Sequence, residues 1–148
     1  MTTASARRRA RELVLQGLYQ RQLSGNGAEQ VRADLVASKG FERADQAYFD
    51  ELWRGVTSDY DALVSAVEPH LTRKAADLSP IERAILVIAA WELKARLDIP
   101  YRVVINEAVE LAKSFGGTDG HKYVNGVLDK VAAEVRRIEV DAARKKNG

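Results

Sequence analysis

The sequence has no cysteine among its 148 residues and only two histidines, His70 and His121. The lack of cysteine excludes a disulfide scaffold, a thiol nucleophile and cysteine-ligated metals, and so few histidines disfavour a histidine-rich metal site. No apolar run approaches the roughly 18 residues of a membrane-spanning helix, and no signal-peptide segment follows the basic N-terminus. We therefore expect an intracellular, cytoplasmic protein that binds no membrane, no metal ion and no cofactor.

Proline and glycine are also scarce, with 3 and 10 residues, and alternating strand-like runs are rare. Apolar residues instead recur at three- and four-residue steps, which predicts an all-α protein. The length fits one compact domain over residues 1–148, built from five to seven helices. We expect helices over residues 5–23, 28–38, 44–68 and 119–140, with two more between residues 80 and 116. Residues 141–148 are expected to form a frayed basic tail.

Two local patterns refine these expectations. The string Ser79-Pro80-Ile81-Glu82 is typical of a helix start, because serine caps free N–H groups and proline at the first position loses no hydrogen bond. The helix that follows is apolar on most sides, so we expect it at the centre of a bundle. Asn125-Gly126 is a common hairpin dipeptide, but the helical spacing continues across it, which favours an unbroken helix there.

A glycine-rich turn is the first candidate site. Residues 116–122 combine three glycines with His121 and Lys122 ahead of a helix, so their N–H groups could hold an anion. The glycine spacing and Tyr123, which stands where a nucleotide loop needs serine or threonine, argue against a phosphate loop. A plain inter-helix turn is the simpler interpretation. An enzyme that uses Asp119 at this turn is a further alternative with little support.

Arginines at the start of the chain are the second candidate. Arg7, Arg8, Arg9 and Arg11 give residues 1–11 a net charge of +4, whereas the other residues sum to −2. Guanidinium groups pair bidentately with phosphate and stack on bases. The cluster could be a solubilising tail, but it runs directly into an amphipathic helix, and there Arg7 and Arg11 would share a face. The pattern indicates an ordered nucleic-acid contact.

Single-stranded nucleic acids also need aromatic side chains on which bases stack. Tyr123, beside Lys122, is the best stacking candidate, and Tyr19 and Tyr101 are the other tyrosines without a clear place in the core. Three other aromatic residues lie on the apolar stripes of predicted helices, so we expect them in the core. They are Phe49, Trp53 and Phe115.

Three strings together resemble the NusB family of bacterial transcription antitermination factors. They are ARRRARE followed by QGLY (6–12 and 16–19), PYRVVINEAVELAKSFG (100–116) and HKYVNGVLDK (121–130), and the likeness extends over residues 6–138. The resemblance implies an all-helical fold of two small bundles. It also implies binding to the boxA segment of nascent RNA with the ribosomal protein NusE. That complex joins an RNA-polymerase assembly that suppresses termination on ribosomal RNA operons.

The resemblance assigns roles to particular residues. RNA contact is implied for Arg7, Arg8, Arg9, Arg11, Lys113, Asp119, Lys122 and Tyr123. Contact with NusE is implied for Tyr19 and Glu82. A carboxylate repels phosphate, so Asp119 would accept from a base edge or a ribose hydroxyl, or orient a neighbouring cation.

The preferred hypothesis is a non-enzymatic RNA-binding adaptor, in which the arginines and the glycine turn form one continuous surface. The alternative is a homodimeric protein-interaction module without direct RNA contact, which would hide its basic face when RNA is absent. The same fold occurs as the RNA-binding module of a ribosomal RNA methyltransferase. We expect the stand-alone factor, because 148 residues leave no room for a cofactor domain.

Overall fold

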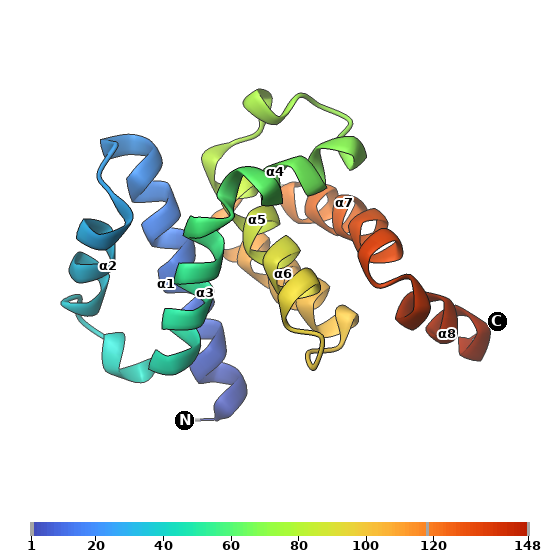
Figure 1. Cartoon of the computed structure of the whole chain (residues 1–148), viewed down its shortest axis with the longest axis horizontal. Helices are drawn as coiled ribbons and strands as arrows, with labels where there is room; N and C mark the ends of the chain where they lie inside the picture. Colours follow the sequence, from blue (N-terminus) through green and yellow to red (C-terminus); the bar gives the residue numbers. More distant parts are fainter. Residues whose placement is uncertain (1, 118, 148) are drawn as a thin grey trace. The chain divides into compact units, whose positions relative to one another are not determined.

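The computed structural model describes residues 2–117 and 119–147, and over these residues it contains eight α-helices, three short 3-10 helices and no strand (Figure 1). The expected all-α class is confirmed, although the helices outnumber the five to seven that we expected. The backbone divides into two compact units, Met1–Asp59 (unit 1) and Tyr60–Gly148 (unit 2). This division agrees with the two small bundles that the family resemblance implies.

Unit 1 contains α1 (Thr3–Ser24), α2 (Ala28–Val36), the 3-10 helix η1 (Phe41–Arg43) and α3 (Gln46–Ser58). Figure 1 shows α2 and α3 beside α1, in agreement with their contacts.

Helix α1 begins with a capping box between Thr2 and Ser5 and ends at Gly25 in the left-handed conformation, with φ of 74°. Its buried side packs on α3 near Gly17, where an added Cβ would lie 2.6 Å from Cζ3 of Trp53. Glycine is therefore required at position 17 for this close approach.

Unit 2 contains α4 (Tyr60–Val67), η2 (Glu68–His70), η3 (Ala75–Asp77), α5 (Pro80–Ala95), α6 (Tyr101–Phe115), α7 (Gly120–Val135) and α8 (Arg137–Asn147). Helix α5 packs against α4, α6 and α7, and its residues 84–93 are all buried, so the expected central helix is confirmed. The Ser79 hydroxyl accepts the N–H of Glu82 at 3.1 Å, as the sequence predicted. Helix α7 runs unbroken through Asn125-Gly126.

Three expected boundaries differ from the structure. The helix expected over residues 44–68 is divided at Asp59, where φ is −110° and ψ is 19°. The helix expected over residues 119–140 is divided at Arg136, where φ is −121° and ψ is 39°. The chain then continues as α8 through residues 137–147, so the frayed tail expected from residue 141 is helical where the structure describes it.

The side chain of Arg136 explains the break between α7 and α8. It is only 3% exposed and binds backbone carbonyl groups. Its guanidinium donates to four carbonyl oxygens at distances from 2.7 to 3.2 Å, those of Glu92, Leu93, Arg96 and Ile99. The carbonyls in the last turn of a helix lack helical donors, so a cation placed there satisfies them and complements the helix dipole. Arg136 thus caps α5 from a position about 40 residues later in the chain.

Glu139 completes this arrangement at the neighbouring helix. One of its carboxylate oxygens accepts the N–H of Tyr101, the first residue of α6, at 2.9 Å. The other accepts from Arg136 at 2.7 Å. Burial raises the pKa of the Glu139 carboxyl, but the hydrogen bond from Tyr101 and the hydrogen bond and charge of Arg136 outweigh burial and lower this pKa overall. The start of α8 therefore holds the end of α5 and the beginning of α6.

Candidate nucleic-acid interface

The arginines of α1 divide into two groups. Arg7 and Arg11 share the face that packs on Tyr48 of α3, with their guanidinium carbons 4.7 and 5.5 Å from the centre of its ring. Arg7 also lies 3.8 Å from the Asp45 carboxylate. Arg11 is only 3% exposed, in contrast to the expected RNA contact, so a phosphate in solvent does not reach its guanidinium in this structure.

The second group faces a surface hollow in unit 1. Arg8 is exposed and Arg9 is half-buried, with its guanidinium 3.4 Å from the Glu12 carboxylate. These three side chains line a hollow of about 370 Å³ together with Ser5 and Arg43. Arg43 ends η1 and was missed by the sequence analysis, because no pattern places residue 43 beside the first turns of α1.

The glycine turn of unit 2 lies between α6 and α7, where Gly116 caps α6 with an extended backbone and Gly120 begins α7. The cations assigned there, Lys113 and Lys122, are exposed, as is Asp119. Asp119 lies 3.7 Å from the Lys122 ammonium group, and the role expected for this carboxylate stays a prediction. Thr118 lies outside the described residues.

Tyr123, the expected stacking residue, is half-buried, and its ring already contacts an arginine. The guanidinium carbon of Arg73 lies 4.3 Å from the centre of its ring, a cation–π distance. The Tyr123 hydroxyl accepts the N–H of Thr72 at 3.2 Å. One face of the ring is thus occupied, so a base would stack on the other face or displace Arg73.

Glu82 contacts the same arginine, Arg73. Its carboxylate lies 3.9 Å from the Arg73 guanidinium, and its side chain is 12% exposed. The structure therefore brings Glu82, expected to contact NusE, and Tyr123, expected to contact RNA, to the same arginine. Tyr19, the other residue assigned to NusE, is 36% exposed on α1. Sequence spacing gave no signal for Arg73, which follows η2 in an irregular segment.

Phe115 does not lie in the core, where we expected it. Its place on the apolar stripe of residues 104–115 predicted a core position, but the side chain is 49% exposed. Helix α6 ends at Phe115, so the buried side of the helix does not extend over the ring. An exposed aromatic side chain therefore lies two residues from Lys113 at the glycine turn.

The rest of the described chain offers little for other chemistry. Residues 2–117 and 119–147 contain no group of three or more histidine, cysteine, aspartate or glutamate side chains able to hold a metal ion. None of the helices described is both long and apolar enough to cross a bilayer.

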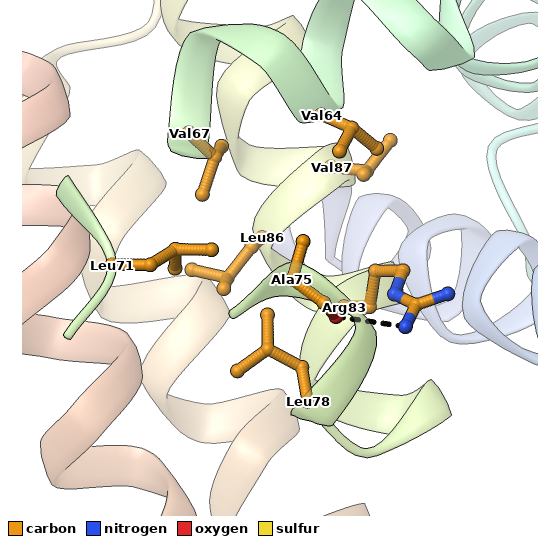
Figure 2. Close-up of a pocket in the computed structure, with 8 residues that line it drawn as sticks. All are labelled: Val64, Val67, Leu71, Ala75, Leu78, Arg83, Leu86 and Val87. Atoms are coloured by element: carbon orange, nitrogen blue, oxygen red, sulfur yellow. Dashed lines mark hydrogen bonds between the residues drawn. The ribbon is translucent and has the colours of Figure 1, made fainter. Parts of the chain in front are cut away.

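A small pocket of unit 2 measures only about 10 Å³, close to the volume needed for one water molecule. Figure 2 shows the residues around it, with Arg83 donating to the carbonyl of Ala75 at 2.8 Å. It is lined by Val64, Val67, Leu71, Ala75, Leu78, Arg83, Leu86 and Val87. This volume does not accommodate a ligand larger than water.

The described residues define an all-α protein of two helical units, with arginines in the first turns of α1 and lysines around a glycine turn before α7. The model of the NusB family matches residues 8–133. The chain therefore belongs to the NusB family.

Similar proteins agree with this membership over nearly the whole chain. The transcription antitermination protein NusB of Paraburkholderia xenovorans (strain LB400) is 58% identical over 142 residues, which cover 96% of this chain and 99% of that protein. Its counterpart in Ralstonia pickettii (strain 12J) is 56% identical over 140 residues, which cover 95% and 90% of the two chains.

Two solved structures resemble the fold. NusB of T. maritima has a TM-score of 0.77 and 30% identity, with 86% of this chain and 91% of that chain covered. A crystal structure of the antitermination factors NusB and NusE with double-stranded RNA has a TM-score of 0.72. The match covers 86% of this chain and 96% of that chain. At 24% identity, the second likeness supports the fold alone.

Proposed function

We propose that this chain is a non-enzymatic antitermination factor that binds boxA-type single-stranded RNA together with NusE. In this proposal it joins an RNA-polymerase complex on ribosomal RNA operons, and therefore acts in the cytoplasm. Membership of the NusB family over residues 8–133 is the observation that carries the proposal. The names of the curated relatives support the antitermination role. A protein of this fold has been crystallised with NusE and double-stranded RNA, which makes NusE and RNA the partners to test.

The proposed RNA contacts follow the exposure of the side chains. Arg8, with the accessible parts of Arg7 and Arg9, contacts phosphates from unit 1. Arg11 instead supports α1 by packing on Tyr48.

Unit 2 contributes contacts from the glycine turn. Lys113 and Lys122 provide charge there, and Asp119 lies beside Lys122. Tyr123 and the exposed ring of Phe115 offer surfaces for bases. That the two units act as one RNA-binding domain remains a prediction.

The proposed NusE contacts are Tyr19 and, through Arg73, Glu82. Tyr19 is directly accessible, whereas the Glu82 carboxylate is mostly covered and faces Arg73. Glu82 therefore acts by fixing Arg73 against Tyr123. Glu82→Gln is expected to weaken NusE binding less than Tyr19→Ala does, since only the tyrosine offers a free surface.

A fluorescence anisotropy titration tests the RNA contact. A short boxA RNA and a scrambled RNA of equal length would be titrated with and without NusE at several salt concentrations. If about four phosphates are neutralised, log affinity falls with log salt at a slope of about −3. We expect NusE to tighten binding to boxA more than to the scrambled RNA. An affinity that does not change with salt would contradict the proposal.

A homodimeric interaction module is a second candidate. Ile138 is 88% and Leu97 is 67% exposed, and both line a surface hollow of about 450 Å³ in unit 2. Exposed apolar surface of this kind can be covered by another protein. Native mass spectrometry with and without RNA separates the candidates. A stable dimer that shows no RNA-bound species would favour the module over the adaptor.

A further inference from the structure

The hollow in unit 1 gathers cations from two separate segments of the chain. Arg8 and Arg9 come from the first turns of α1, and Arg43 comes from η1, more than thirty residues later. Ser5 also lines the hollow, but its hydroxyl is hydrogen-bonded to Thr2 in the capping box of α1. The polar chemistry of this surface therefore rests on the three guanidinium groups and on Glu12.

Three arginines and one carboxylate line the hollow, and the Glu12 carboxylate lies 3.4 Å from Arg9. Arg8 also has a partner within the described chain. The Nε–H group of Arg9 is buried and, within residues 2–117 and 119–147, has no hydrogen-bond acceptor. Arg43 is exposed and makes no ion pair with any residue that the structure describes. Guanidinium groups that share a surface with unused donors bind oxyanions favourably.

The Arg43 side chain lies close to the backbone at Gly40. Gly40 precedes η1 with φ of 90°, a left-handed conformation that favours glycine. An added Cβ at residue 40 would lie 2.6 Å from Nη2 of Arg43, so the guanidinium folds back over the glycine. A side chain at residue 40 would therefore shift the end of the flexible Arg43 side chain.

We infer that this hollow binds one phosphate of an RNA backbone, with Arg43 as its third cation and Glu12 as an internal competitor. The inference rests on the proposed function and adds a residue that sequence analysis did not assign. A volume of about 370 Å³ exceeds that of a phosphate and leaves room for the adjoining ribose. A bound phosphate would offer acceptors to Arg43 and to the accessible part of the Arg9 guanidinium, while Glu12 would repel it.

Four variants test this assignment in the full chain, by RNA titration at several salt concentrations. Arg43→Ala removes the third cation, and Arg54→Ala is its control, because Arg54 is exposed on α3 and does not line the hollow. Glu12→Gln removes the competitor, and Glu29→Gln, at an exposed position of α2, is its control. Circular dichroism would verify that all four variants fold.

The expected effects have opposite signs. One phosphate contact on a single strand contributes about 0.7 to the salt slope, which corresponds to about fivefold in affinity near 0.1 M salt. Arg43→Ala should therefore weaken binding about fivefold and flatten the slope by about 0.7, whereas Arg54→Ala changes neither. Glu12→Gln should strengthen binding by several-fold relative to Glu29→Gln. Equal affinities for Arg43→Ala and Arg54→Ala would overturn the inference while leaving the proposed function intact.

A second measurement keeps the inference testable without RNA binding. Nitrogen-15 spectra of the arginine side chains would be recorded during titration with inorganic phosphate. Shifts of the Nε–H signals of Arg9 and Arg43, with none for Arg54, are the expected result. If the wild-type chain bound no RNA, the proposed function would fail, and the absence of these shifts would then reject the hollow as an oxyanion site as well.

Discussion

The first turns of α1 and the junction between α7 and α8 both contain arginine, but the two regions use it differently. Arg136 at the junction gives its donors to four backbone carbonyls and a carboxylate, and it is almost fully buried. Arg8 and Arg9 line an open hollow, and Arg9 has a buried donor with no hydrogen-bond partner among the described residues. The two regions therefore differ in how their arginine donors are used, which the number of arginines alone does not show.

The largest expected effect is on stability, at the junction. Arg136→Ala leaves four carbonyls without their donor and Glu139 without its cation, so it should lower the free energy of unfolding by about 3–5 kcal/mol. Urea denaturation would measure this change. The control is Arg137→Ala, which removes a side chain that is 82% exposed and should change stability by less than about 0.5 kcal/mol. Similar losses for the two variants would erase the contrast between the regions.

Close packing provides the next test. Gly17→Ala places a methyl group against the Trp53 ring and should destabilise the protein by about 1–3 kcal/mol. Gly126→Ala is its matched control, since an added Cβ at that position of α7 meets nothing within 4 Å. Alanine in a helix interior should there raise stability by about 0.5–1 kcal/mol. Thermal unfolding of both variants would show whether the signs differ.

A smaller effect concerns RNA affinity. Arg8→Ala removes one exposed cation, so binding should weaken about fivefold near 0.1 M salt and the slope should flatten by about 0.7. Stability should change little. The titration that tests the proposed function measures both quantities. A normal salt slope for Arg8→Ala would mean that Arg8 does not contact phosphate.

The smallest effect is on pH dependence at Glu139. The pKa of this carboxyl is lowered from its ordinary value of 4.5, so ionised Glu139 stabilises the fold above that pH. The stabilisation is lost as the pH falls through the lowered pKa. Its side chain is 38% exposed, so we expect less than about 1 kcal/mol. Urea unfolding of the wild type and Glu139→Gln from pH 7 to pH 3 should show a stability difference that disappears at acid pH. Asp129→Asn, at an exposed position of α7, should show no such trend.

Local signals in the sequence were sufficient for most of the fold. The Ser79 cap, the central helix and the helical course through Asn125-Gly126 each depend on neighbours within about one turn. The break at Arg136 could not be predicted in this way, because its cause is a set of carbonyls about 40 residues earlier in the chain. The apolar spacing continues past Arg136 and gives no sign of it.

The candidate site was predictable in outline but not in detail. The four-residue step placed Arg7 and Arg11 on one face, and the structure confirms that both lie over Tyr48. The same step could not reveal that this face is the packed one. Arg43, which lines the hollow of unit 1, and Arg73, which packs on Tyr123 in unit 2, lie outside the α-helices, where periodicity carries no information about contacts.

The capping of α5 by Arg136 has a consequence for motion. One side chain closes the last turn of α5, while its ion-pair partner closes the first turn of α6, and both lie where α8 starts. Detachment of α8 would expose the amide groups at the end of α5, at the beginning of α6 and at the start of α8 in one event. Hydrogen exchange there should consequently proceed at a common rate, as a single cooperative opening and not as separate fraying of helix ends.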